Sequence, residues 1–552
     1  MNNIIELKIK GMTCDSCASH VSKALASVNG VETVKVNGWQ SGHATVNLKE
    51  KTDSKELIDA VKKAGYGAEI EKAFITEENK NSFAGKTDYD LIIIGGGSAA
   101  FAAAIKASEL EKKTLMINEG LPIGGTCVNV GCVPSKTLIR TAEQLHAANH
   151  PNFSSINPGD NKIDFKKVIR QKTELVEGLR QHKYVDVLQD DPNVKIIKSY
   201  GKLIDKNTVE ADGQKFSAKN ILIAAGSTTF FPDLPGLKES GYLTNDTLYE
   251  LGKLPEHLIV IGGRYIALEN AQMFARLGSK VTILQRSLRI LPDEMPDISE
   301  KLKDYLEEEG IEIKTGVKIK SIEKHKGKVK ITASVKNEDD TIEGTHLFVA
   351  TGRKGNTRNL GLEELGIELH KNSFIKTNDF MQTSIPNIYA AGDVTGEYLF
   401  VYSAAYEGSL AVGNMFSENK TEKDYSVFPW VIFTDPQVAG VGMDENQAYD
   451  NKIDYEVSTI QLKDVPRSIA ARNTKGFIKL IRNKENDKLI GARILASEGS
   501  ELLMEISLAI KYGVKVKELK QMFHPYLTLS EGVKLAAISF DKDVKKLSCC
   551  AV

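Results

Sequence analysis

Two copies of a strand–glycine–helix pattern constrain the fold of this chain more than any other feature of its sequence. The first copy follows the apolar run 91–94. In such a pattern Gly95 makes the tight turn, Gly97 lets a pyrophosphate approach the backbone, and Ala100 lets the helix pack closely on the strand. Glu119 ends the next predicted strand, where a carboxylate can hold a pair of ribose hydroxyls. This segment therefore predicts a dinucleotide site.

The second copy follows the apolar run 259–261 and departs from the pattern at one position. Gly262 and Ala267 keep the turn and the close packing of the helix. Arg264 stands at the second glycine position, so a side chain occupies the place where the backbone would approach a pyrophosphate. The strand after this helix leads into Arg286 and not into a carboxylate. An arginine at that place favours a 2′-phosphate, and hence NADPH over NADH.

The duplication predicts an α/β chain with two doubly wound dinucleotide-binding domains, the second inserted into the first. An α+β domain follows them, and a ferredoxin-like βαββαβ unit with strands expected at 4–10, 31–37, 42–48 and 68–70 precedes them. The expected boundaries are 1–70 for the ferredoxin-like unit, 71–88 for a flexible linker, 89–230 and 346–425 for the first dinucleotide domain, 231–345 for the second, 426–540 for the α+β domain and 541–552 for a tail.

All six cysteines of the 552-residue chain fall into three close pairs. Thiolates bind soft metals and exchange with disulfides, so the pairs predict a protein that passes something thiophilic between dithiols. The first pair lies at a predicted helix start, where the helix dipole lowers thiol pKa values. A CxxC pair can also be a redox motif, but the βαββαβ order favours metal binding, with Tyr66 packed near the loop. The pairs are the N-terminal pair (Cys14, Cys17), the core pair (Cys127, Cys132) and the C-terminal pair (Cys549, Cys550).

Charge and hydropathy exclude several classes of function. The net charge is −1 and there is no basic run, so nucleic acid is not an expected partner. No apolar run is long enough to cross a bilayer, and the first residues lack the features of a signal peptide. We therefore expect no membrane insertion and a cytoplasmic protein, in which unpaired thiols stay reduced.

The segment 124–136, with the sequence GGTCVNVGCVPSK, resembles the redox-active disulfide of the pyridine nucleotide–disulfide oxidoreductases. The resemblance covers residues 89–540 and implies a homodimer that binds FAD in the first dinucleotide domain and NADPH in the second, with residues 426–540 as the dimerisation domain. It also implies that Cys132 is the thiolate in charge-transfer contact with the flavin and that Cys127 is the interchange thiol. Lys136 and Glu269 match the family's ion pair beside the flavin ring.

Two further segments match the family. Asp393, in Ala-Ala-Gly-Asp, resembles the residue that binds the ribityl chain, and Tyr265 resembles the tyrosine that gates the nicotinamide pocket. The residues expected at FAD are Gly95, Gly97, Ala100, Glu119, Gly125, Thr126, Lys136, Gly226 and Asp393, and those expected at NADPH are Gly262, Arg264, Ala267, Arg286 and Gly352.

The C-terminal region departs from the disulfide reductases of the family, which carry His-Pro-x-x-x-Glu. Here His524 stands seven residues before Glu531. Aligning Thr528-x-x-Glu531 with the family's Thr-x-x-Glu puts Tyr526 in the histidine position and leaves His524 as a loop or surface histidine. A site without this general base is poor at splitting organic disulfides and suits a substrate that moves by ligand exchange. We expect Tyr526 to flank a bound metal.

The C-terminal pair and the N-terminal Gly-Met-Thr-Cys-x-x-Cys segment point to one kind of member. The latter resembles heavy-metal-associated domains, and both features resemble family members that reduce mercuric ion. The resemblance implies reduction of thiol-bound Hg(II) to Hg(0) by NADPH through FAD, for mercury detoxification. The N-terminal pair would acquire Hg(II), and the C-terminal pair would deliver it to the core pair of the partner subunit, at an active site shared between subunits.

Several alternatives stay open at this point. An upstream mercury transporter or carrier would be a further partner. A general FAD-dependent disulfide reductase of the lipoamide or glutathione type is a second reading, which the histidine register and the two additional dithiols argue against. A metal carrier with a vestigial core is a third, which the intact core pair, Lys136, Glu269 and Asp393 argue against.

Overall fold

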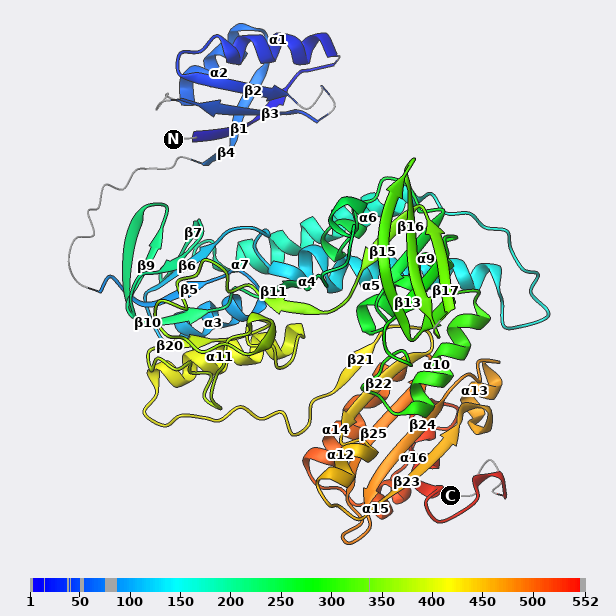
Figure 1. Cartoon of the computed structure of the whole chain (residues 1–552). Helices are drawn as coiled ribbons and strands as arrows, with labels where there is room; N and C mark the ends of the chain where they lie inside the picture. The colour runs from blue at the N-terminus through cyan, green and yellow to red at the C-terminus, as the bar shows by residue number, and fades with distance from the viewer. Residues whose placement is uncertain are drawn as a thin grey trace. The chain divides into compact units, whose positions relative to one another are not determined.

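The computed structural model describes residues 3–13, 15–36, 39, 41–49, 54–74, 87–336 and 338–546. The chain forms two compact units, residues 1–85 and 86–552, and each unit is described here by itself (Figure 1). Cys14 and both members of the C-terminal pair lie outside the described residues.

The first unit is the expected βαββαβ fold. Its sheet is antiparallel in the order β2-β3-β1-β4. Alternate residues of β1 and β3 and the apolar faces of both helices form one core, which includes Ile5, Leu7, Val21, Leu25, Val46, Leu57 and Val61. The last strand extends to Phe74, so the expected boundary between the domain and a linker at 70/71 is wrong by four residues. The elements are β1 (Asn3–Lys10), α1 (Asp15–Ala26), β2 (Val31–Val36), β3 (His43–Leu48), α2 (Ser54–Lys63) and β4 (Gly67–Phe74).

The second unit begins with the first dinucleotide domain, whose parallel strands run in the order β7-β6-β5-β10-β20. Strands β5, β6 and β20 are apolar and buried because helices cover the sheet. Helices α3 and α11 lie against each other (Figure 1), and a Cβ on Gly408 would come within 2.1 Å of the carbonyl oxygen of Ala99. The elements are β5 (Tyr89–Ile94), α3 (Ser98–Glu109), β6 (Thr114–Asn118), α4 (Gly125–Val130), α5 (Cys132–Asn149), α6 (Phe165–Arg180), α7 (Asp186–Leu188), β7 (Val194–Lys198), β8 (Lys202–Leu203), β9 (Thr208–Ala211), β10 (Gln214–Ile223), β11 (Ser227–Thr229), β20 (Ile388–Ala390) and α11 (Val401–Phe416).

The second dinucleotide domain has a parallel sheet in the order β14-β13-β12-β18 and a three-stranded antiparallel sheet, β15-β16-β17. Strand β18 pairs with β12 over four residues, so it belongs to this domain. The expected end of the domain at residue 345 is therefore wrong, because the backbone hydrogen bonds of 346–349 complete its sheet. The elements are α8 (Asn245–Leu248), β12 (His257–Ile261), α9 (Tyr265–Arg276), β13 (Lys280–Gln285), α10 (Pro296–Glu308), β14 (Glu312–Thr315), β15 (Val317–His325), β16 (Lys328–Val335), β17 (Glu338–Gly344), β18 (His346–Val349) and β19 (Arg353–Gly355).

The C-terminal domain is α+β, as expected, with an antiparallel sheet in the order β21-β22-β25-β24-β23. Its helices pack on this sheet around a separate core that includes Val441, Ile478, Leu480, Ile494, Ile506 and Val533. A short 3-10 turn over Gly499–Leu502 leads directly into the helix that begins at Leu503. The elements are β21 (Trp430–Ile432), β22 (Gln437–Gly442), α12 (Glu445–Asp450), β23 (Tyr455–Gln461), α13 (Pro466–Ala470), β24 (Phe477–Asn483), β25 (Leu489–Ala496), α14 (Leu503–Lys511), α15 (Val516–Gln521) and α16 (Ser530–Ile538).

Candidate active site

The core pair lies where α4 ends and α5 begins. Cys127 is in α4 and Cys132 is the first residue of the 18-residue helix α5, and both thiols are half-buried. The pKa of Cys132 is lowered to about 7, chiefly by a hydrogen bond from the thiol of Cys127 and also by the positive charge of Lys136, against the effect of burial. The same hydrogen bond raises the pKa of Cys127. Because the helix N-terminus also favours an anion, Cys132 is the better thiolate of the pair.

Lys136 and Glu269 form the expected ion pair. Lys136 follows Cys132 by one turn of α5, and its Nζ donates a hydrogen bond of 2.7 Å to Oε2 of Glu269 on α9. The other carboxylate oxygen of Glu269 accepts a 2.9 Å hydrogen bond from the backbone N–H of Phe433. The ammonium of Lys136 also lies 4.7 Å from the centre of the Phe433 ring. The pair is thus held by two dinucleotide domains and by a segment of the C-terminal domain.

Two adjoining cavities meet at the core pair. One has a volume of about 380 Å³ and is lined by Cys132, Lys136, Tyr265, Glu269 and Asp393, among others. The second, of about 110 Å³, is lined by both cysteines of the core pair and by Gly97, Thr126, Gly226 and Asp393. Since Cys132 borders both cavities, a flat ring system in this space would contact its sulfur atom.

A third cavity, of about 380 Å³, continues along the first glycine turn and is lined by Gly95, Gly97, Glu119, Gly125, Thr126 and Gly226. A Cβ on Gly125 would lie 2.7 Å from the Cα of Gly97, so only glycine permits this narrow cradle. Ala100 is fully buried in the helix behind it.

Asp393 stands where this groove meets the core pair. It accepts a 2.7 Å hydrogen bond from the hydroxyl of Ser227, and burial raises its pKa. An elongated groove with a glycine cradle and a half-buried carboxylate fits FAD.

The second glycine turn borders a cavity of about 320 Å³, which is lined by Arg264, Tyr265 and Gly352. A Cβ on Gly262 would come within 2.4 Å of the carbonyl oxygen of Ala350, so the tight turn requires glycine there. The guanidinium of Arg264 forms two hydrogen bonds with the carboxylate of Asp293, which holds this side chain at the start of α9.

Two other residues expected at NADPH, Ala267 and Arg286, do not line this cavity in the described part of the chain. Ala267 is fully buried, in keeping with close packing of α9. Arg286 is exposed directly after β13 and is not among the residues that line the cavity in the described part of the chain.

The segment between α15 and α16 corrects one expectation. His524 lies in a loop, which is one of its two expected placements, but its side chain is only 5% exposed and its Nε2 lies 2.6 Å from Oε1 of Glu505, so it is a buried, paired histidine and not a surface one. Its neighbours Phe523 and Tyr526 are exposed, at 100% and 54%. Among the described residues of one chain, Tyr526 does not line the cavities at the core pair.

In the first unit, Cys17 lies in the first turn of α1, and its sulfur atom is 3.7 Å from the hydroxyl of Thr13. Tyr66 packs against the core of that unit, and its ring lies 3.9 Å from the position of a Cβ on Gly11, which precedes the N-terminal pair. Cys14 lies outside the described residues, so the geometry of the N-terminal pair is not assigned.

Sequence reasoning missed Glu407, which is fully buried in α11. Its carboxylate accepts hydrogen bonds from the N–H of Gly392 (2.7 Å) and the hydroxyl of Tyr425 (2.6 Å), and burial raises its pKa to about 7. Gly392 precedes Asp393, so Glu407 supports the turn that presents this carboxylate. A single acidic residue in the otherwise uncharged helix 401–416 is the signal that could have revealed it.

Comparison with known proteins agrees with this geometry. Residues 89–408 match the family "Pyridine nucleotide-disulphide oxidoreductase", residues 428–537 match the dimerisation domain of that family, and residues 6–67 match the "Heavy-metal-associated domain". The same class of protein is defined by a groove that fits FAD, a second nucleotide turn and a dithiol at the junction of α4 and α5. The chain therefore belongs to the pyridine nucleotide-disulphide oxidoreductases.

Within this class the chain belongs to the mercuric reductases. It is 42% identical to the mercuric reductase of Lysinibacillus sphaericus over the full length of both chains. It is 40% identical to that of Staphylococcus aureus, over 100% of this chain and 99% of the relative. FAD and NADPH are the cofactors.

A solved structure also matches the second unit. The flavoprotein disulfide reductase RclA of Escherichia coli superposes with a TM-score of 0.73 at 28% identity, over 82% of this chain and 99% of RclA. Among the described residues, no helix is both long and apolar enough to cross a membrane.

Proposed function

We propose that this chain catalyses the NADPH-dependent reduction of thiol-bound Hg(II) to Hg(0), for mercury detoxification. The overall reaction is Hg(II) + NADPH → Hg(0) + NADP⁺ + H⁺. The observation that carries this proposal is the asymmetric core pair, in which Cys132 is the better thiolate and borders the same cavity as Lys136 and Glu269. Soft Hg(II) binds thiolates tightly, so a dithiol is suited to take it from small thiols by ligand exchange.

In this proposal the residues of the chain bind Hg(II), orient the two cofactors and stabilise the Cys132 thiolate. Cys127, the interchange thiol, displaces one small thiol from Hg(II) and passes its proton to the departing thiolate, and the Cys132 thiolate displaces the second small thiol. Lys136 stabilises the thiolate by its positive charge. Bound FAD would supply the electron pair that originates from NADPH, and release of Hg(0) would leave Cys127 and Cys132 as two thiolates. Tyr265 and Asp393 both line this cavity, where Tyr265 would cover the nicotinamide and Asp393 would hold the ribityl chain.

Delivery of the metal involves the other two cysteine pairs. We assign acquisition of Hg(II) to the N-terminal pair and its transfer to the core pair of the partner subunit to the C-terminal pair. The dimerisation domain supports an active site shared between two copies of the chain. Exposed Tyr526 would then flank the metal in the partner's site. The proposal also includes a cytoplasmic location and thiol-bound Hg(II) as the substrate. An upstream mercury transporter or carrier would be a further partner.

One observation favours a second candidate, a general disulfide reductase. The 2.6 Å contact of His524 with Glu505 is an imidazole–carboxylate pair, which is the arrangement of a general base. However, the His524 side chain is only 5% exposed, so it has little surface to offer a leaving thiol.

The experiment that separates these functions compares substrates in one assay. NADPH oxidation is followed with Hg(II) in excess thiol, with oxidised glutathione and with lipoamide. We expect turnover with Hg(II) and almost none with the two disulfides, and a Cys132→Ser variant should lose the Hg(II)-dependent rate. Faster turnover of either disulfide would favour the general reductase, and His524→Ala should then abolish it.

A further inference from the structure

One face of α9 contacts a short segment that follows β21. At the start of this face Glu269 accepts the hydrogen bond from the N–H of Phe433. One turn later the N–H of Asp435 donates to Oε1 of Gln272 (2.7 Å), and Nε2 of Gln272 donates to the carbonyl oxygen of Asp435 (2.8 Å). Another turn on, Nη2 of Arg276 donates to Oδ2 of Asp435 (3.0 Å). Residues three or four apart share a helix face, so these three side chains fix the segment along its length.

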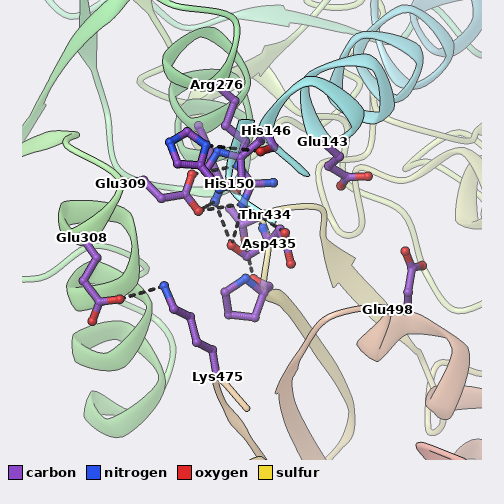
Figure 2. Close-up of polar contacts among 12 residues, drawn as sticks. Glu143, His146, His150, Arg276, Glu308, Glu309, Thr434, Asp435, Lys475 and Glu498 are labelled. Atoms are coloured by element: carbon purple, nitrogen blue, oxygen red, sulfur yellow. Dashed lines mark hydrogen bonds and ion pairs between the residues drawn. The ribbon is translucent and has the colours of Figure 1, made fainter. Parts of the chain in front are cut away.

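The far end of this contact is a charge cluster of Arg276, Glu309 and Asp435 in which the arginine side chain is buried (Figure 2). Arg276 is 5% exposed and makes two hydrogen bonds to the carboxylate of Glu309, of 2.8 and 2.6 Å. Gln272 donates to the same carboxylate (3.0 Å). The guanidinium is bonded to two carboxylates, and its removal would leave both of them without a cation. The cluster therefore gives Asp435 a defined position relative to α9.

The near end of the contact is the Lys136–Glu269 pair. Phe433 touches both members, through its N–H to Glu269 and through its ring to the ammonium of Lys136. Phe433 also lines the cavity that Cys132 borders. A change in the position of this segment would consequently move both charges of the pair relative to the cavity.

We propose that Gln272 and Arg276 are positioning residues for the Lys136–Glu269 pair, acting through residues 433–435. This role rests on the proposed function, since the pair serves the reaction at the core pair. Misplacement of catalytic groups by about 1 Å can cost a large factor in rate even when the altered residue is remote from the chemistry. Neither residue is among those that line the described cavity at the core pair, so their effect is indirect.

The test uses the FAD-loaded full-length enzyme and the variants Gln272→Leu, Arg276→Met and Arg276→Lys. Lys475→Met is the matched control, because Lys475 of the C-terminal domain forms a 2.7 Å ion pair with Glu308 of α10 and so joins the same two domains without contacting residues 433–435 (Figure 2). The readouts are the rate of flavin reduction by NADPH, the thiolate–flavin charge-transfer absorbance at one pH, and FAD content.

We expect Gln272→Leu and Arg276→Met to slow flavin reduction by on the order of tenfold, the scale of one hydrogen bond to a charged group, and to weaken the charge-transfer absorbance. Arg276→Lys keeps the charge and should recover part of the rate, and Lys475→Met should behave as the parent. Should Arg276→Met lose FAD, Arg276→Lys and Gln272→Leu decide the matter. Parent-like rates and spectra in both of these would overturn the proposal.

A double-mutant cycle distinguishes positioning from general destabilisation. In a Glu269→Gln background, Gln272→Leu should have little further effect on flavin reduction if it acts through Glu269. Equal slowing in both backgrounds would overturn the positioning role. These readouts require only NADPH and FAD, so they stay informative if Hg(II) proves not to be the substrate.

Discussion

Lys136 and Glu269 are 133 positions apart in the sequence, yet their side chains meet at 2.7 Å beside the core pair. The contact joins α5, which begins with Cys132, to α9, which begins with Tyr265 at the second nucleotide turn. One ion pair thus connects the helix that presents the thiolate with the helix that borders the NADPH cavity. Loss of this ion pair should therefore affect both the Cys132 thiolate and the binding of NADPH.

The first prediction concerns the pH dependence of Cys132. A lowered pKa means that the thiolate forms above pH 7 or so and is lost as the pH falls through that value. The charge-transfer absorbance of the two-electron-reduced enzyme should therefore rise with a midpoint near pH 7. Lys136→Gln removes a positive charge that favours the thiolate, so the midpoint should move to higher pH. A midpoint that stays the same in the variant would show that Lys136 does not stabilise the thiolate.

The second prediction concerns the C-terminal pair. Replacing both Cys549 and Cys550 by alanine should leave flavin reduction by NADPH intact. Turnover of thiol-bound Hg(II) should fall on the order of a hundredfold, because a tethered dithiol acts at high effective concentration. Steady-state assays in excess thiol, with stopped-flow flavin reduction as the control, check both parts. Unchanged mercury turnover would rule out delivery by this pair.

The third prediction concerns nucleotide choice. Arg286 is exposed after β13, where charge-assisted hydrogen bonds to a 2′-phosphate would each contribute about 1.5–3 kcal/mol. Arg286→Ala should raise the KM for NADPH by about tenfold or more and leave NADH nearly unaffected. Steady-state kinetics with both nucleotides measure this. If the parent enzyme uses NADPH and NADH equally, the assignment of Arg286 is wrong.

The fourth prediction concerns the N-terminal domain. Residues 86–552 form a compact unit, so a chain that starts there should fold, dimerise, bind FAD and reduce Hg(II) by itself. The isolated first unit should bind one Hg(II) through Cys14 and Cys17 with release of protons. Full-length protein should outperform the shortened chain at low glutathione and match it at high glutathione. An advantage that is the same at both concentrations, or absent at both, would argue against acquisition.

The fifth prediction concerns Glu407. Its pKa in the folded protein, about 7, is above the ordinary glutamate value, so folding favours the protonated form and stability falls as the pH rises from 4.5 through 7. Glu407→Gln cannot ionise, and it should be more stable than the parent above pH 7 by on the order of 3 kcal/mol. The difference in melting temperature of the FAD-loaded proteins should shrink toward pH 5. A difference independent of pH would mean that Glu407 does not titrate in this range.

Local patterns were sufficient to predict the elements that form the nucleotide turns. Gly95 and Gly262 both adopt positive φ angles at the expected strand ends, at 134° and 127°. The β-α-β-β-α-β order of the first unit could also be predicted, because each element shows its own apolar periodicity. Domain ends were less predictable. Strand β18 belongs to the second domain because of its pairing with β12, and such pairing partners cannot be read from one segment alone.

The sequence by itself determined the class of protein, since the glycine turns and the spacing between Cys127 and Cys132 are local features of the chain. Only the tertiary structure decided which remote groups act on them. It paired His524 with Glu505, buried Glu407 beneath the turn at Asp393, and placed Phe433 against the Lys136–Glu269 pair. Burial and charge pairing depend on which elements pack together in three dimensions, and a pKa or an ion pair is set by those neighbours and not by the local sequence.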